Sequence, residues 1–192
     1  MIILINSLSE LYQRFDILYQ DILIICKTCT YHDCEGYTWL LPEEADNLGS
    51  SKAQIIEING NCNFINPFVD LIPTNFETMK PQCPLLDNKL CSVYNQRPLV
   101  CRTYPVGLTS IDGKLFFVLF SDCQYSMMMS YMSKMEFIEK VLDILSDCSL
   151  DLFDNIITTY SAVDNLFKYP EGRNEYEVLA SCRDLRLVIS NS

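Results

Sequence analysis

Hydrophobic residues recur at three- and four-residue steps near the start of the chain. They follow Ser7, and Glu10 stands three residues after that serine. The apolar positions are Leu8, Leu11, Tyr12, Phe15, Leu18, Tyr19 and Ile22. Serine and glutamate at this distance form a capping box, in which each side chain satisfies a backbone amide at the start of a helix. The pattern predicts an amphipathic helix over residues 7–25.

The last third of the chain also has helical spacing. Apolar residues recur at three- and four-residue steps over residues 129–147, 150–167 and 175–189. Ser149 stands where an N-cap is expected, and a turn around Pro170 separates the second segment from the third. The sequence therefore predicts a three-helix C-terminal part.

Shorter patterns occupy the middle of the chain. Pro42 and the two glutamates after it predict a short helix that ends near Gly49, because proline and acidic residues suit the first turn of a helix. Residues 54–58 form a candidate strand. Residues 106–120 alternate around Asp112-Gly113, which predicts a short hairpin.

The other middle segments have no regular pattern. Residues 30–38 are polar, residues 60–84 contain repeated prolines, and residues 83–105 are predicted to be loop-like or short-helical. The expected fold class is α+β, mainly α, in a single domain over residues 1–192. A cysteine-rich, loop-dominated core at residues 26–123 would lie between the N-terminal helix and a helical tail at residues 124–192.

Composition and charge narrow the function classes. The chain has 192 residues, of which 49% are hydrophobic, and this length suits one domain with its own core. A net charge of −11 disfavours nucleic acid as a partner. The apolar runs are too short to span a bilayer, and the N-terminus lacks the pattern of a secretory signal. We expect a cytoplasmic protein with no membrane span and with a protein partner or protein substrate.

The cysteines carry the candidate chemistry. There are 10 of them against a single histidine, His32. In a reducing compartment this density favours metal ligands or redox groups over structural disulfides. Cys26-x-x-Cys29 can place two thiolates on one metal, whereas a thioredoxin-like redox pair would follow a strand rather than a helix. Cys148 and Cys182 lie on predicted helical faces, where core thiols are expected.

A longer ordered motif joins these cysteines. It consists of Cys26-x-x-Cys29 with Cys34, Leu41-Pro42-Glu43-Glu44, Cys83-Pro84-Leu85-Leu86, Cys91-Ser92-Val93-Tyr94-Asn95-Gln96-Arg97-Pro98, Cys101-Arg102-Thr103-Tyr104-Pro105 and Cys123. Over residues 26–123 this motif resembles the CxxCxxCC cysteine-cluster family, which is described as zinc- or iron-chelating. The family includes YkgJ-type proteins and is related to the flagellin lysine N-methylase FliB. Its first block usually ends in adjacent cysteines, whereas Glu35 follows Cys34 here. One ligand is therefore absent or supplied by Cys62, His32 or Asp33.

The motif and the resemblance together indicate a thiolate metal centre. The candidate metal ligands are Cys26, Cys29, Cys34, Cys83, Cys91, Cys101 and Cys123. Because such a centre is anionic, a neighbouring cation stabilises it, so Arg97 and Arg102 are candidate cofactor-binding residues. The alternative for Arg97 is an ion pair with a local carboxylate. The cofactor would be an iron-sulfur cluster, with 4Fe-4S favoured, or Zn²⁺.

Three functions remain open at this point, and the sequence identifies no catalytic residue. The first is an iron-sulfur protein with a redox or enzymatic role. The second is a structural zinc module that binds a partner through its helical tail. The third, implied only by the resemblance, is a FliB-like protein-lysine N-methyltransferase.

Overall fold

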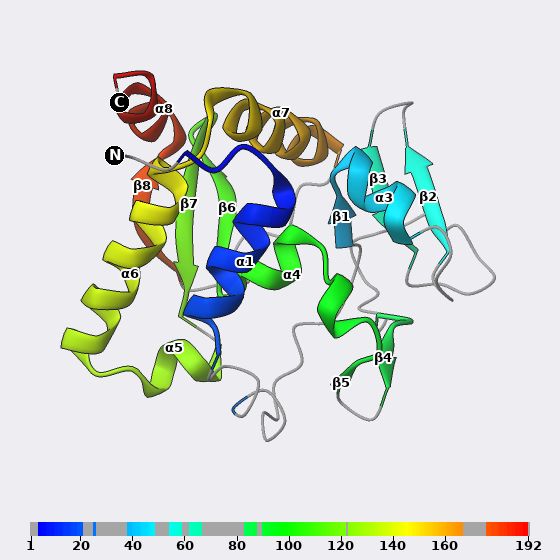
Figure 1. Cartoon of the computed structure of the whole chain (residues 1–192), viewed down its shortest axis with the longest axis horizontal. Helices are drawn as coiled ribbons and strands as arrows, with labels where there is room; N and C mark the ends of the chain where they lie inside the picture. Colours follow the sequence, from blue (N-terminus) through cyan, green and yellow to red (C-terminus); the bar gives the residue numbers. More distant parts are fainter. Residues whose placement is uncertain are drawn as a thin grey trace.

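A computed structural model of the chain describes residues 4–20, 25, 38–48, 54–58, 62–66, 83–87, 90–121, 123–166 and 176–191. Over these residues the chain forms seven α-helices and three small sheets. This confirms a mixed α+β fold. Figure 1 shows one sheet at each side of the molecule and the third, smallest one below.

Helix α1 (Leu8–Leu18) begins as its sequence predicts. The Ser7 side chain accepts from the Glu10 amide, and the Glu10 carboxylate accepts from the Ser7 amide, so the capping box is confirmed. The helix ends at Leu18, earlier than the predicted end at residue 25, because Tyr19 leaves helical geometry. The Tyr19 hydroxyl donates to the backbone carbonyl of Thr103, and the helical spacing does not predict this tertiary contact.

The larger sheet is built on the predicted hairpin. Strands β6 (Val106–Ile111) and β7 (Lys114–Phe120) pair antiparallel across Asp112 and Gly113, whose φ angles are 51° and 72°. Two central residues with positive φ match the right-handed twist of the strands, so the hairpin prediction is confirmed.

A third strand corrects the prediction for residues 175–189. Strand β8 (Tyr176–Ser181) pairs antiparallel with β7, and helix α8 (Cys182–Ser190) begins only after it. The helical prediction is therefore wrong for the first half of this segment. Without β8, the backbone groups along one edge of β7 would lack partners, and this tertiary pairing overrides the helical spacing.

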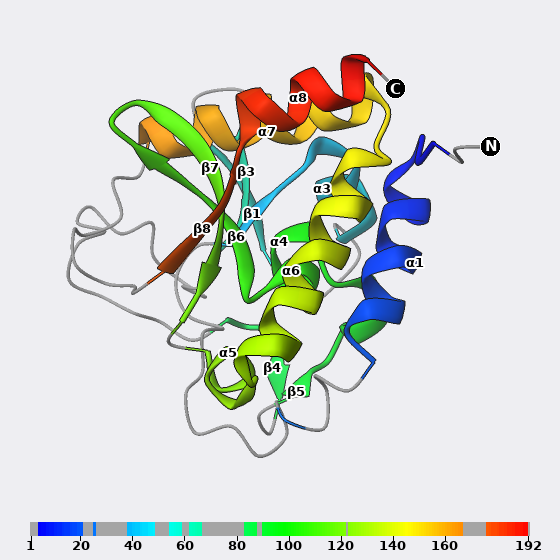
Figure 2. The ribbon, with the colours of Figure 1, turned by 90° about the vertical axis from the view of Figure 1, so that its left-hand side faces the viewer.

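The long C-terminal helices are confirmed. Helix α6 (Tyr131–Ser146) and helix α7 (Leu150–Leu166) match the predicted segments, and the Ser149 hydroxyl accepts from the Leu152 amide at 3.4 Å. A short helix, α5 (Gln124–Met128), precedes them and was not predicted. In Figure 2, α7 and α8 cross one end of the β6–β7–β8 sheet while α6 runs beside α1.

The second sheet lies in the cysteine-rich middle. Strands β1 (Thr38–Leu40), β3 (Cys62–Ile65) and β2 (Ile55–Ile58) are antiparallel in the order β1-β3-β2, and helix α3 (Pro42–Leu48) follows β1. This confirms the predicted strand at residues 54–58 and the predicted helix after Leu41. The irregular structure predicted for residues 60–84 is wrong at β3, which forms the centre of the sheet and buries Phe64.

The rest of the middle consists of short elements. Strands β4 (Leu86–Asp87) and β5 (Leu90–Cys91) form a two-stranded sheet, and a 3₁₀ turn (Tyr94–Gln96) and helix α4 (Leu99–Thr103) follow. The 3₁₀ turn and α4 agree with the loop-like or short-helical prediction for residues 83–105, whereas the two short strands were not predicted.

A hydrophobic core connects the first and last parts of the chain. It extends from Ile5 to Ile189 and includes Phe15 of α1, Phe64 of β3 and Phe153 of α7. The division at residue 123, and the single domain itself, stay predictions. None of the helices described here is long and apolar enough to cross a membrane.

Candidate metal centre

Cys83 and Cys91 lie at the two ends of the β4–β5 hairpin. Leu86 pairs with Cys91 across the hairpin, and the Leu86 amide donates to the Cys83 carbonyl at 3.0 Å, which closes a tight turn after Cys83. The two thiols are close enough for charge on Cys91 to act on Cys83. Cys83 also packs against a small core formed by Leu40, Leu48, Ile65 and Leu85, so the turn is attached to the β1–β3–β2 sheet.

Backbone amides point at both sulfurs. Burial raises the pKa of the Cys83 thiol, and amides of Leu85 and Leu86 donate to its sulfur and oppose that rise. Burial likewise raises the pKa of Cys91, and the Val93 amide opposes it in the same way. Amide donors stabilise a thiolate and fix its direction, which is the environment that metal-ligating sulfurs have in proteins.

Arg97 lies beside Cys91. Its positive charge lowers the pKa of the Cys91 thiol, the guanidinium lies 3.7 Å from the centre of the Tyr94 ring, and Nη2 is 3.2 Å from Asp16 Oδ1. The residue is only 8% exposed, yet its Nε is buried without a hydrogen-bond partner among the residues described. Arg97 therefore has both of the neighbours expected from the sequence, a cysteine and a carboxylate, and one buried donor besides.

Arg102 uses all three of its nitrogens within the protein. Nη1 is 2.5 Å from Asp16 Oδ2, Nε donates to the Arg97 carbonyl at 2.9 Å, and Nη2 donates to the Asn95 carbonyl. Its guanidinium also lies 4.3 Å from the centre of the Tyr12 ring. Arg102 thus fixes the loop that carries Arg97 and ties it to α1.

One stripe of α1 faces this loop and was not identified from the sequence. Tyr12 and Asp16 are four residues apart and share a face of α1, and Tyr19 follows as the C-cap of the helix. Tyr12 donates to the Glu44 carboxylate, Asp16 binds both arginines, and Tyr19 donates to Thr103. An acidic residue between two tyrosines at helical spacing, beside the apolar face, is the signal that could have revealed this stripe.

Tyr19 lies within electrostatic reach of two of the predicted site residues. Burial is the main cause of its raised pKa, charge on Cys123 raises it further, and Arg97 lowers it. The end of α1 is therefore near both of these predicted site residues.

Glu44 belongs to the Leu41–Glu44 block of the motif, but sequence analysis assigned it no role at the site. Its carboxylate is 5% exposed and accepts from the Leu41 amide at 2.8 Å, from the Leu99 amide at 2.5 Å and from the Tyr12 hydroxyl. Burial raises its pKa, and these three donors oppose the rise. Glu44 joins α1, α3 and α4, so it positions the helix that carries Cys101.

The remaining cysteines differ in exposure. Cys101 on α4 is exposed, whereas Cys123 at the N-cap of α5 is buried, as is Cys62 inside β3. Cys148 and Cys182 are buried in the main core, and burial raises the pKa of each thiol to about 12. The structure thus places these two thiols in a core environment, as the sequence predicts.

No group of three or more His, Cys, Asp or Glu residues with metal-binding geometry occurs among the residues described. Cys83 and Cys91 are the pair that the described chain brings together. The other predicted ligands, Cys26, Cys29 and Cys34, lie outside the described residues, and so do the alternatives His32 and Asp33.

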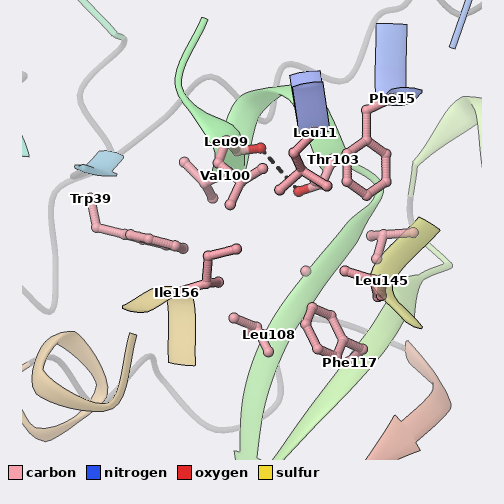
Figure 3. A pocket seen from close by; sticks show the side chains of 12 residues that line it. Leu11, Phe15, Trp39, Leu99, Val100, Thr103, Leu108, Phe117, Leu145 and Ile156 are labelled. Carbon is pink, nitrogen blue, oxygen red and sulfur yellow. Dashed lines mark hydrogen bonds between the residues drawn. The ribbon is translucent and has the colours of Figure 1, made fainter. Parts of the chain in front are cut away.

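The molecule also has a small cavity that none of the described cysteines lines. Its volume is about 30 Å³, and Figure 3 shows that Leu11, Trp39, Leu108 and Ile156 point into it, with Thr103 at its edge. A space of this size lined by apolar groups is a gap in the core rather than a substrate site.

The fold and the β4–β5 hairpin define a small α+β protein that brings the thiols of Cys83 and Cys91 together. The sequence profile of the CxxCxxCC family, a proposed zinc- or iron-chelating domain, matches residues 25–123. This match covers more than half of the chain, so the protein belongs to the CxxCxxCC family. No curated protein and no solved structure matches it.

Proposed function

We propose that the protein binds a metal centre through thiolates of the CxxCxxCC motif and that this centre is an iron-sulfur cluster. Cys83 and Cys91 are two of its proposed ligands, and the structure describes both. Cys26, Cys29 and Cys34 are the proposed partners from the first block, and Cys101 and Cys123 are the other candidate ligands. The family description supports metal chelation as such, with zinc or iron as the metal.

The single observation that carries this proposal is the pair of amide-supported thiols on the β4–β5 hairpin. Two sulfurs interact electrostatically, three backbone amides donate to them, and a buried arginine lies beside one of them. Thiolates are soft, anionic ligands that suit iron-sulfur clusters and Zn²⁺. When bound, an iron-sulfur cluster would supply one-electron transfer.

The residues around the hairpin would hold and tune the centre. The amides of Leu85, Leu86 and Val93 orient the sulfurs, and Arg97 offsets part of the negative charge of a thiolate cluster. Arg102 keeps Arg97 in place by donating a hydrogen bond to the Arg97 backbone carbonyl. The redox role is part of the proposal, since hydrogen bonds and charge near the sulfurs set the potential of such a cluster.

Anaerobic purification followed by metal analysis and absorption spectroscopy tests this proposal. We expect a brown protein with iron, acid-labile sulfide and broad visible absorption. A colourless protein with stoichiometric zinc would replace the cluster with a structural zinc site. Purified protein that takes up neither metal, even after reconstitution with iron and sulfide or with Zn²⁺, would refute the metal centre itself.

A structural zinc module is the second candidate. The amide-supported turn after Cys83 favours it equally, because zinc sites use the same thiolate geometry.

Lysine methylation like that of FliB stays a prediction from the resemblance alone. Transfer of a radiolabelled methyl group to flagellin-type substrates tests it, and no transfer with metal-loaded protein would remove it.

A further inference from the structure

We infer that Asp16 is a positioning residue for the metal centre: it holds Arg97 so that the buried Nε of that arginine donates to the sulfur ligands around Cys91. The inference rests on the proposed metal centre, which it deepens. Asp16 lies on α1, ten residues before the first cysteine of the motif, and no pattern in the chain links it to metal chemistry.

The geometry of Arg97 leaves one donor for the site. Asp16 accepts from Nη2, and the face of the guanidinium lies on the Tyr94 ring, so two restraints fix the plane of the group. Nε is the buried nitrogen that lacks a hydrogen-bond partner within the described chain. A buried N–H without a partner costs roughly 1–3 kcal/mol, and a thiolate or sulfide beside Cys91 would remove that cost.

Asp16 also controls the arginine indirectly. Both of its carboxylate oxygens accept from Nη1 of Arg102, and Arg102 in turn donates to the Arg97 backbone carbonyl. The carboxylate therefore orients the Arg97 side chain by one contact and its backbone by another. Because Arg102 is buried, replacing Asp16 leaves a buried cation without its counterion.

Titration with Co²⁺, which reports thiolate ligation by visible absorption, tests the inference. Asp16→Asn removes the charge without changing the size of the side chain, and we expect a 10- to 100-fold loss of Co²⁺ affinity, as is typical when a group that supports a ligand is lost. Asp147→Asn is the matched control, because Asp147 also binds α1, through Arg14 at 2.8 Å, but away from the cysteines. Its affinity should stay within about 2-fold of the wild type.

Two further variants separate positioning from folding. Arg97→Lys keeps the charge but lacks the Nε donor and the planar group, and we expect a shifted cobalt–thiolate band together with weaker binding. Thermal unfolding of the metal-free proteins shows whether Asp16→Asn still folds. Asp16→Glu keeps the charge and should recover most of the affinity for Co²⁺.

The outcomes separate this inference from the proposed function. If wild-type protein shows no cobalt–thiolate band, or if Cys91→Ser binds Co²⁺ as the wild type does, the proposed centre is wrong at this hairpin. If Cys91→Ser loses the band while Asp16→Asn retains full affinity, only the role of Asp16 is wrong. Equal losses in Asp16→Asn and Asp147→Asn would also overturn it, since any loosening of α1 would then have the same effect.

A second, independent observation concerns the junction of α5 and α6, where exposed methionines gather. Met127, Met128, Met132 and Met135 are between 44% and 75% exposed, and Tyr131 between them is 74% exposed. Two of these methionines, Met132 and Met135, also line a groove of about 720 Å³. The groove is lined further by Ile138, Leu142, Glu136, Glu139 and Asp143. We propose that this groove binds a basic amphipathic helix of a partner protein.

Two features of the groove select this partner. Methionine side chains adapt to varied apolar surfaces, and apolar grooves of this kind commonly accept one face of a helix. Three carboxylates line the groove, with Lys140 paired to Glu136, and the whole chain carries a net charge of −11. Acidic groups repel an anionic membrane and a second copy of the same face, whereas they attract lysine and arginine.

Fluorescence anisotropy with a labelled leucine–lysine helix as long as α6 tests this surface, with a leucine–glutamate helix as the reference peptide. We expect the basic peptide to bind and the acidic one to fail. Replacing Met132 and Met135 by Ser should weaken binding at least 10-fold, whereas replacing Leu187 and Val188, exposed on α8, should not change it. Equal losses in both double variants, or equal binding of both peptides, would overturn the proposal.

Discussion

The backbone amide of Leu99 donates a hydrogen bond of 2.5 Å to the buried carboxylate of Glu44. Leu99 is the first residue of α4, whose N-cap, Pro98, has no side-chain hydrogen bond to offer. A helix start needs acceptors for its free amides. A glutamate 55 residues earlier supplies one, so the helix that carries Cys101 depends on α3 for its position.

Replacing Glu44 should therefore destabilise the fold. Glu44→Gln presents an amide donor to groups that are themselves donors, and we expect a loss of about 1.5–3 kcal/mol of unfolding free energy, the usual contribution of a hydrogen bond to a charged group. Chemical denaturation of the metal-free protein measures it. Glu43→Gln, at the exposed neighbouring position, should change stability by less than about 0.5 kcal/mol. Equal effects of the two substitutions would contradict the role of Glu44.

Comparing the wild type with Glu44→Gln also predicts how the free energy of unfolding depends on pH. Burial holds the pKa of Glu44 above its ordinary value of 4.5 in the folded state, so the folded protein binds this proton more tightly than the unfolded chain does. Stability then falls as pH rises from 4.5 through the raised pKa, and Glu44→Gln lacks this contribution. The advantage of the wild type over Glu44→Gln should shrink across that interval in urea unfolding experiments. An advantage that grows with pH would show that the pKa is lowered instead.

Removing single thiols should divide the cysteines into two groups. We expect Cys83→Ser, Cys91→Ser and Cys101→Ser to lower bound metal strongly, because a hydroxyl replaces a thiolate ligand. Cys148→Ser and Cys182→Ser should leave metal content unchanged, since both thiols are buried in the main core. Metal analysis after anaerobic reconstitution measures both groups, and equal losses across them would contradict the division.

Alkylation of the metal-free folded protein should follow exposure and pKa. Cys101 is exposed, whereas burial raises the pKa of Cys148 and of Cys182 to about 12. At pH 8 a thiol with that pKa is thiolate in roughly one molecule in ten thousand, and the thiolate is the nucleophile. Iodoacetamide should therefore modify Cys101 and leave the two core thiols unmodified, as peptide mass mapping would show. Rapid labelling of Cys148 would indicate an open core.

Local patterns predicted the elements that local interactions decide. The capping box of Ser7 and Glu10, the turn at Asp112-Gly113 and the N-cap at Ser149 all lie where the sequence places them. Each depends on residues within four positions of one another, so the sequence alone contains the required information. The cysteine motif belongs to the same class, because family membership follows from its order and spacing.

The prediction failed where a distant strand decides the structure. Residues 176–181 have helical spacing but pair with β7, and Cys62 lies in the central strand of a sheet rather than in a loop. In both segments the hydrogen bonds come from residues remote in sequence, and backbone groups left without them would cost more than a weak local preference supplies.

The sequence by itself determined that this is an acidic chain of the CxxCxxCC family, which of its thiols are candidate ligands and that Cys148 and Cys182 belong to the core. Only the tertiary structure decided how the candidate site is supported. Asp16 meets Arg97 and Arg102 more than 80 residues away, at separations of 81 and 86, and Glu44 meets Leu99. Such contacts depend on how helices pack, and no spacing along the chain specifies them, because the two partners of each contact lie in different local patterns.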